Sequence, residues 1–163
     1  LIPQVRKSIS IPLIAAGGMG TGSAMLAAFA LGAEGIQMGT RFALTQESSA
    51  SKEFKELCIN LKEGDTILSL KKLSPTRLIK NDFYTTVQEA EDRGATAEEM
   101  RGILGRGRAK KGIFEGDLSE GELEIGQVSS LIEDLPTAAD VVNSVIDEYN
   151  AKVENMISQD MKF

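Results

Sequence analysis

The feature that most constrains the fold is a pattern near the start of the chain, in which two short apolar segments flank an Ala-rich stretch. Residues 11–16 (IPLIAA) end at a pair of glycines, and residues 34–38 (EGIQM) end at another glycine. A continuous apolar run this short is typical of a strand buried on both faces of a parallel sheet. Residues 23–31, between the two runs, predict a helix with Gly32 as its C-terminal cap. We therefore expect a strand–helix–strand unit with a parallel sheet.

The rest of the chain predicts helices joined by irregular connections. Phe54, Leu57, Cys58 and Leu61 recur at the spacing of one apolar helix face. Thr96 has Glu99 three residues later, which is the spacing of a capping box at a helix start. Helices are also expected at residues 83–93 and 136–157, short extended pieces at 66–70 and 76–79, and an acidic loop at 115–126.

Composition excludes several classes of function. The 163 residues include no histidine, so an imidazole base, a histidine metal ligand and a Ser–His triad are impossible within this chain. The net charge of −6 argues against a general nucleic-acid binder. A run of about eighteen apolar residues, as a membrane span requires, does not occur. The single cysteine, Cys58, favours a reducing, cytoplasmic location, and its place on an apolar helix face indicates a structural thiol.

The two glycine-containing turns suggest phosphate binding. Residues 16–22 (AGGMGTG) connect the first strand to the helix, and residues 37–41 (QMGTR) follow the second strand. Glycine lets the backbone come close to a ligand, and the N–H groups at a helix start suit a phosphate. The spacing matches neither the dinucleotide fingerprint nor the P-loop. Two strand ends that share one phosphate are typical of strands seven and eight of a (β/α)8 barrel, and tight turns without a ligand are the alternative.

The stretch IPLIAAGGMGTGSAMLAAFALGAEGIQMGTRF resembles the flavin phosphate-binding stretch of the nitronate monooxygenase (2-nitropropane dioxygenase) family. That family includes the FMN-dependent enoyl-acyl-carrier-protein reductase II. Residues 76–83 (TRLIKNDF) are similar to its Arg-x-x-x-Asn segment. Residues 115–132 (EGDLSEGELEIGQVSSLI) resemble its glycine- and acid-containing stretch with Gly-Gln. This later pattern resembles the reductase branch more than the shorter monooxygenases.

The resemblance implies an α/β protein: the C-terminal part of a TIM barrel, with its last two parallel strands, followed by a mostly helical extension. Residues 1–50 would end the FMN-binding barrel, and residues 51–163 would form the extension that packs on it. A complete barrel needs roughly 250 residues, so we expect the chain to be a C-terminal piece of a longer protein. The FMN-binding residues that the resemblance implies are Gly17, which shapes the turn, and Gly18, Gln37, Met38, Gly39 and Thr40.

The resemblance further implies an FMN-dependent oxidoreductase. The preferred activity is that of an NAD(P)H-dependent enoyl-acyl-carrier-protein reductase of fatty-acid synthesis, and the alternative is a nitronate monooxygenase. NADH or NADPH would be the co-substrate, and an acyl-carrier-protein thioester or a small nitronate the substrate. We expect no catalytic residue and no metal ligand in this chain, because the family's catalytic histidine lies on an earlier strand; the piece alone would be inactive. A non-catalytic flavin-binding half barrel and a helical interaction protein stay open.

The charged residues have simpler interpretations beside functional ones. Residues 105–112 hold a basic cluster that would suit NAD(P)H phosphates or an acidic carrier protein, although a solvated helix start is the simpler interpretation. Arg41 would pair with the phosphate or tie the second strand to the next helix. Glu115 and Asp117 are expected in a turn. The apolar stripe of the last helix would pack on the barrel, or less simply form a homodimer contact. The basic cluster comprises Arg106, Arg108, Lys110 and Lys111.

Overall fold

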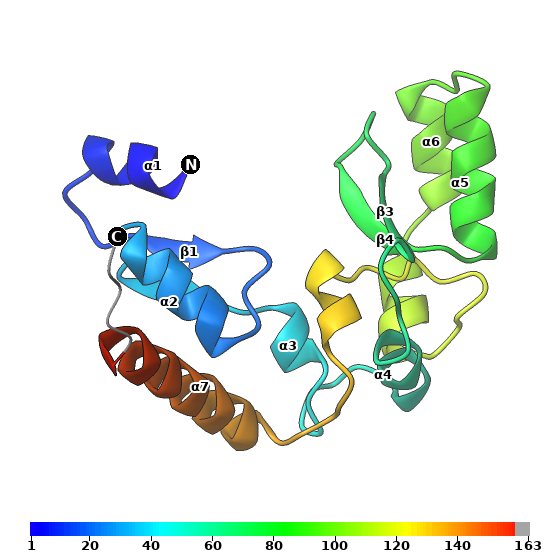
Figure 1. Ribbon diagram of the computed structural model, residues 1–163. Helices are drawn as coiled ribbons and strands as arrows, with labels where there is room; N and C mark the ends of the chain where they lie inside the picture. The colour runs from blue at the N-terminus through cyan, green and yellow to red at the C-terminus, as the bar shows by residue number, and fades with distance from the viewer. Residues whose placement is uncertain (159–163) are drawn as a thin grey trace. The chain divides into compact units, whose positions relative to one another are not determined.

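The structure is a computed structural model that describes residues 1–158, and it divides into two compact units (Figure 1). Residues 1–47 and 136–158 make up the first unit, and residues 48–135 make up the second unit. The end of the expected extension, residues 159–163, lies outside the described residues.

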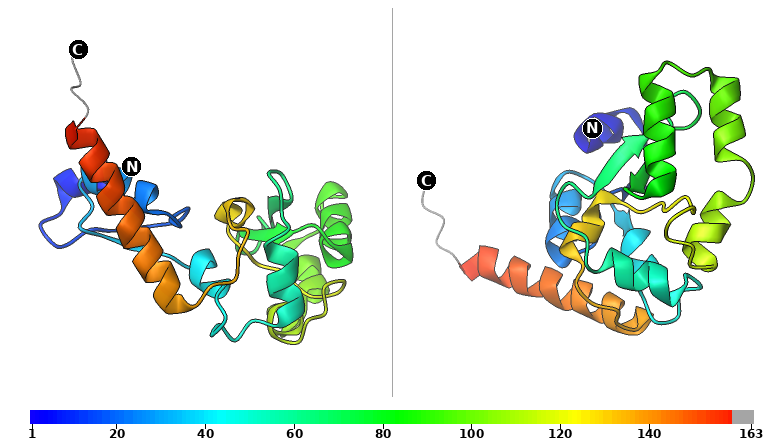
Figure 2. Two further views of the ribbon diagram at one scale, coloured as in Figure 1. Left: turned by 60° about the horizontal axis from the view of Figure 1, so that its bottom comes forward. Right: turned by 90° about the vertical axis from the view of Figure 1, so that its right-hand side faces the viewer.

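The first unit contains the predicted strand–helix–strand arrangement. Strands β1 and β2 pair in parallel, with Ile14 opposite Gly35 and Ala16 opposite Gln37. Helix α7 runs alongside α2 in the views of Figures 1 and 2. The parallel pairing confirms the expected α/β class for this unit. Its elements are α1 (Ile2–Ser8), β1 (Ile14–Ala16), α2 (Gly22–Ala30), β2 (Gly35–Gln37), α3 (Thr40–Ala43) and α7 (Ala138–Ser158).

Strand β1 is buried on one face only, so the expectation of burial on both faces is wrong. Ala15 is buried together with Ala28 and Ala33, on the side of the sheet that α2 covers. Ile14 points to the opposite face and remains 51% exposed. The physical reason is that a two-stranded sheet with helices on one side leaves its other side open.

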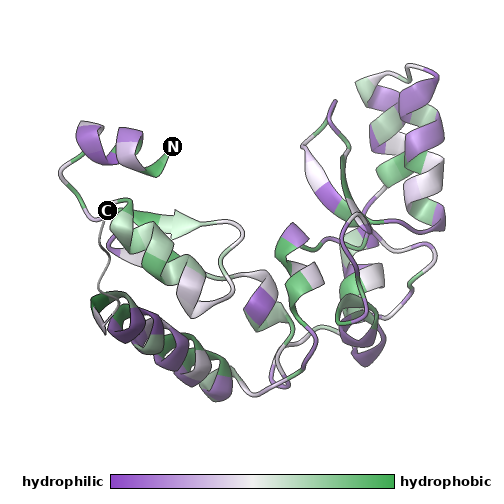
Figure 3. Cartoon of the chain, in the orientation of Figure 1, coloured by the Kyte–Doolittle hydropathy of each residue, from purple (hydrophilic) through white to green (hydrophobic). Residues whose placement is uncertain are grey.

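Helix α7 packs closely against α2. A Cβ atom on Gly22 would collide with the backbone of Tyr149 and Val145, so only glycine allows this approach. The ring of Phe29 meets that of Tyr149 edge to face, with centroids 5.7 Å apart. Figure 3 shows α2 as hydrophobic along most of its length, whereas α7 alternates hydrophobic and hydrophilic residues. The last helix therefore belongs to the first unit, which differs from the expected single extension of residues 51–163.

The second unit combines a hairpin with helices. Strands β3 and β4 pair antiparallel, with Thr66 opposite Ile79, and helices α5 and α6 lie side by side (Figure 2). The helices and extended pieces predicted for this region are confirmed, including the capping box of Thr96 and Glu99. Its elements are α4 (Lys52–Cys58), β3 (Thr66–Ser69), β4 (Thr76–Ile79), α5 (Asp82–Asp92), α6 (Ala97–Leu104), the π-helical turn η1 (Lys110–Phe114) and the 3-10 turn η2 (Gln127–Leu131).

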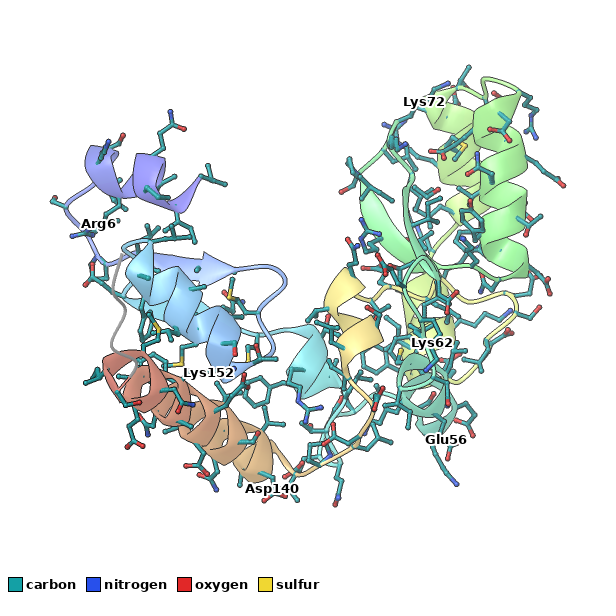
Figure 4. The ribbon with its side chains drawn as sticks, in the orientation of Figure 1. Arg6, Glu56, Lys62, Lys72, Asp140 and Lys152 are labelled. Atoms are coloured by element: carbon teal, nitrogen blue, oxygen red, sulfur yellow. The ribbon has the colours of Figure 1, made fainter. Side chains whose placement is uncertain are left out.

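The core of the second unit lies between the hairpin and helices α5 and α6. Leu78 from β4, Phe83 and Val87 from α5, and Met100 from α6 are each at most 1% exposed. Lys72, labelled in Figure 4, closes this core at the hairpin end: its Nζ donates to the carbonyl oxygens of Gly94 and Ala95, at 3.1 and 2.6 Å. Side chains from both helices and the hairpin thus hold the unit together.

Cys58 is fully buried on α4, as expected for a structural thiol. Burial raises its pKa to about 12, which keeps the thiol protonated. Within residues 1–158, no three of the His, Cys, Asp and Glu side chains lie together so as to hold a metal ion. Over the same residues, none of the helices is both long and apolar enough to cross a membrane.

Candidate phosphate-binding site

The two glycine-containing turns lie next to each other because β1 and β2 are parallel and in register. Ala16 and Gln37 are partners at the carboxyl ends of the two strands. Neighbouring strands in a sheet lie about 4.8 Å apart. The residues that follow, Gly17 and Met38, therefore leave the same edge of the sheet side by side. Six residues expected to bind FMN are brought to this edge, and their role in binding stays a prediction.

The turn after β1 has a backbone that only glycine adopts without strain. Gly17 has a φ of +88° and Gly18 a φ of +71°, both in the left-handed region. Apart from the glycine itself and its two neighbours in the chain, no atom lies within 4 Å of the position that a Cβ would take at either residue. Both glycines are also exposed. The turn thus presents its backbone, without side chains, to open space.

The turn after β2 leads directly into a short helix. Gly39 has open space where its Cβ would be, and its carbonyl oxygen accepts a hydrogen bond from the N–H of Ala43 at 2.9 Å. Thr40 is the first residue of α3. A short extra helix of this kind is common beside the phosphate site of (β/α)8 barrels. Helix α3 has only four residues, so the sequence pattern around Gly39 and Thr40 is too short to predict it.

The remaining expected site residues flank these glycines. Gln37 ends β2 and is exposed, while Met38 is half-buried. Arg41 on α3 is only 9% exposed. Two roles were considered for Arg41: pairing with a phosphate, and tying the second strand to the next helix. Burial of its side chain is compatible with either role. They both stay predictions.

The start of α2 is occupied by a carboxylate from α7, which corrects the expectation that its N–H groups face a phosphate. The N–H of Gly22 donates to Glu148 Oε2 at 2.9 Å, and the N–H of Ser23 donates to Oε1 at 3.1 Å. The hydroxyl of Ser23 also donates to Oε1, at 2.5 Å. The next N–H, of Ala24, donates to Thr21 Oγ1 at 3.1 Å. Three backbone N–H donors of the first turn are thus already paired.

The hydrogen bonds to Glu148 favour its charged form. The Ser23 hydroxyl contributes most, followed by the N–H groups of Gly22 and Ser23, and together they lower the pKa of Glu148 below its ordinary value. A helix N-terminus stabilises a negative charge in the same way. Glu148 was not among the expected functional residues, because no local pattern links it to a turn more than a hundred residues earlier.

The acidic loop of the second unit is built as a turn, as expected. Asp117 Oδ1 accepts hydrogen bonds from the N–H groups of Ser119 and Glu120, at 3.1 and 2.8 Å. Lys111 Nζ lies 2.9 Å from Asp117 Oδ2. The hydrogen bonds from Glu120 and Lys111 are the main causes that lower the pKa of Asp117. These contacts leave the carboxylate of Asp117 in a structural role.

The Arg-x-x-x-Asn segment also has structural contacts. Asn81 caps α5 by accepting from the N–H of Tyr84, and its Nδ2 donates to the carbonyl oxygens of Leu118 and Gly121, each at 2.9 Å. Arg77 Nη1 donates to the carbonyl oxygen of Thr66 across the hairpin at 3.1 Å. Both motif residues therefore hold the second unit together.

A family model and solved structures match this chain over nearly its whole length, and curated relatives match about half of it. A family model described as nitronate monooxygenase matches residues 1–148. A protein named "Probable nitronate monooxygenase" from Staphylococcus aureus (strain Newman) is 49% identical over 69 residues, which are 42% of this chain and 19% of that protein. A relative of the same name from Staphylococcus saprophyticus is 41% identical over 93 residues, 56% of this chain and 26% of that protein.

Solved structures give the same result. FabK from Thermotoga maritima matches with a TM-score of 0.88 and 34% identity, over 96% of this chain and 50% of that chain. Nitroalkane oxidase from Streptomyces ansochromogenes matches with a TM-score of 0.75 and 29% identity, over 97% of this chain and 44% of that chain. The chain therefore spans half or less of the length of these proteins and shares the α/β fold of TIM-barrel enzymes.

Proposed function

The chain belongs to the nitronate monooxygenase family, and on this basis we propose that it is the C-terminal part of an FMN-dependent oxidoreductase. β1, α2, β2 and α7 would supply the last two strand–helix units of a TIM barrel, with the second unit inserted before the final helix. The observation that carries this proposal is the register of β1 and β2, which sets two open glycine turns side by side. That is where (β/α)8 barrels bind phosphate.

The residues at this sheet edge fit the phosphate of FMN. A phosphate needs several N–H donors within reach and no side chains in the way. Gly17, Gly18 and Gly39 leave open the space that a Cβ would fill. Because Glu148 already holds the first N–H groups of α2, the phosphate would bind the turn after β1 together with Gly39 and Thr40.

FMN, when bound, supplies electron and hydride transfer, while the protein supplies binding and orientation. This chain would contribute the phosphate end of the site through backbone N–H groups, so the side chain of Met38 matters little. Gln37, exposed at the end of β2, would lie beside the phosphate. We assign no catalytic residue and no metal to this chain.

The preferred activity is reduction of an enoyl thioester carried by acyl-carrier protein, with NADH or NADPH as co-substrate. The likeness to FabK, an enoyl-acyl-carrier-protein reductase II, supports this branch because its TM-score and identity, 0.88 and 34%, exceed the 0.75 and 29% of the nitroalkane oxidase. Oxidation of a small nitronate is the second candidate, supported by the names of the curated relatives and by the nitroalkane oxidase structure. A cytoplasmic location and a homodimer stay predictions.

Two assays on the full-length enzyme separate the branches. We expect oxidation of NADH or NADPH that depends on a crotonyl thioester. Oxygen consumption with an alkyl nitronate, without thioester reduction, would overturn the preferred branch and favour a nitronate monooxygenase. FMN binding without turnover in either assay would favour a non-catalytic flavin-binding protein.

A further inference from the structure

A cleft of about 450 Å³ lies in the second unit, where α6 ends and the π-helical turn begins. The loop of residues 104–108 forms one side of it, and Lys111, Glu115 and Glu120 complete the lining. A volume of this size admits a small molecule rather than a single ion. The cleft is lined wholly by residues of the second unit, and none of its lining residues belongs to the glycine turns of the first.

One positive charge in this cleft has no counter-charge. The other cations here are each paired with a carboxylate: Lys110 with Glu115 at 3.1 Å, Arg108 with Glu120 at 3.4 Å, and Lys111 with Asp117 at 2.9 Å. Arg106 is exposed and forms no ion pair or side-chain hydrogen bond within residues 1–158. Arg106 is therefore the cation of this cleft that is available to a ligand with one anionic group.

The loop around Arg106 is open and held in place. Gly105 and Gly107 have φ values of +64° and +76°, and no atom beyond their immediate chain neighbours lies within 4 Å of the position of a Cβ at either. A ligand can therefore approach the backbone on both sides of Arg106. The left-handed conformation of both glycines explains why glycine, and not a bulkier residue, stands at these positions.

Arg108 fixes the base of the loop. Its Nε donates to the carbonyl oxygens of Ile103 and Leu104, at 3.1 and 2.9 Å, and its Nη1 donates to that of Glu120 at 2.8 Å. Its guanidinium lies over the ring of Phe83, 4.6 Å from the centroid. A loop ordered in this way loses less entropy when it binds a ligand. Arg108 thus positions the loop, and Arg106 is left to meet the ligand.

We propose that this cleft binds the phosphate group of a small phosphomonoester, with the guanidinium of Arg106 as its counter-charge. Guanidinium presents a planar pair of donors that matches two phosphate oxygens. Each of the remaining charges of the lining is in an ion pair, so the cleft offers one guanidinium that is free among the described residues and suits a ligand with a single phosphate group. Its lining shares no residue with the FMN phosphate site proposed above.

Amide chemical shifts of the 15N-labelled full-length protein test this site directly. The probes are inorganic phosphate and AMP, with adenosine as the control that lacks phosphate and sodium chloride to match ionic strength. We expect saturable shifts of the Gly105, Arg106 and Gly107 amides with phosphate and AMP, and none with adenosine. The amides of Gly18 and Gly39 report on the proposed FMN phosphate site in the same spectra. Failure of the cleft proposal can therefore be distinguished from failure of the FMN proposal.

Two variants assign the effect to Arg106. Arg106→Gln is expected to weaken phosphate binding by on the order of tenfold, and Arg106→Lys by less. The matched control is Arg101→Gln, an exposed arginine of α6 outside the cleft lining, which should leave binding unchanged. Three results would overturn the proposal: shifts that do not saturate, equal binding by Arg106→Gln in a folded chain, or acetate binding as tightly as phosphate.

Discussion

Glu148 accepts a hydrogen bond from the backbone N–H of Gly22 at 2.9 Å, so the last helix supplies the anion at the start of α2. The same carboxylate accepts from the N–H and the hydroxyl of Ser23. This arrangement resembles the binding of a phosphate at a helix N-terminus, but the charge comes from the protein itself. The FMN phosphate would therefore bind the neighbouring turns, and α7 is held against α2, the helix that follows the first of these turns.

Removing the carboxylate should destabilise the first unit. Glu148→Ala leaves the N–H groups of Gly22 and Ser23 without an acceptor and removes a charge that the helix dipole favours. We expect a loss of about 1–2 kcal/mol in the free energy of unfolding, measured with denaturant. Glu154→Ala, at an exposed position of the same helix, is the control and should cost less than about 0.5 kcal/mol. Equal losses in both variants would contradict the role of Glu148.

The contribution of Glu148 should depend on pH. Its pKa is lower in the folded protein than in the unfolded chain, so its stabilisation is present above the ordinary carboxyl pKa of about 4.5 and is lost as pH falls below that value. Unfolding measured at several pH values should show the gap between wild type and Glu148→Ala closing from pH 6 to about pH 3. A difference in unfolding free energy that stays constant over this pH range would show that the charge of Glu148 does not contribute to stability.

Glu122 should have the opposite pH dependence. It is 7% exposed, and burial, followed by the charge of Glu124, raises its pKa to about 7. The unfolded chain ionises this group near pH 4.5, before the folded protein does, so stability is lost as pH rises from about 4.5 to 7. Glu122→Gln should remove this loss and stabilise the protein at pH 8 by about 1–3 kcal/mol. Glu133→Gln, at an exposed position, is the control; a Glu122→Gln variant with the wild-type pH profile would contradict the prediction.

The contact of α2 with α7 should not tolerate a side chain at Gly22. Gly22→Ala would place a methyl group against the backbone of Tyr149 and Val145, and we expect a loss of about 3 kcal/mol, seen in thermal and denaturant unfolding. The control is Gly102→Ala, because Gly102 lies inside α6 with open space around it; this change should stabilise by up to about 1 kcal/mol. A Gly22→Ala variant as stable as wild type would show that the two helices do not approach this closely.

The glycine turns should be sensitive to substitution in FMN binding. Gly39→Ala has open space and an ordinary φ of −96°, so it should fold normally and still weaken FMN binding by roughly tenfold, measured by quenching of flavin fluorescence. Riboflavin, which lacks the phosphate, should bind wild type and variant equally. Gly102→Ala, at an exposed glycine of the second unit without a left-handed backbone, should leave FMN binding unchanged. Unchanged FMN affinity in Gly39→Ala would contradict the assigned contact.

Local sequence patterns were enough to predict most elements of the fold. The apolar run before Gly17 gave a strand, and the pairing of Thr96 with Glu99 gave a helix start, because each pattern is complete within a few residues. The short helices α1 and α3 were missed, since seven and four residues carry little periodicity.

Contacts between residues far apart in the chain could not be predicted from local sequence patterns. The contact between Glu148 and Gly22 joins residues far apart in the chain, and only packing of α7 on α2 brings them together. The exposure of Ile14, 51%, depends on which elements cover the sheet. The local sequence around Ile14 does not indicate which face of the sheet is covered. The glycines of the two turns were found because glycine at a strand end has a local conformational reason.

A crystal structure of the full-length protein with FMN tests the central claim most directly, through the distances from the phosphate oxygens to the backbone nitrogens of Gly18 and Gly39. We predict that one phosphate lies within hydrogen-bond distance of both nitrogens, at roughly 2.7–3.2 Å. A flavin phosphate bound elsewhere, or in contact with only one of the two turns, would contradict the proposal.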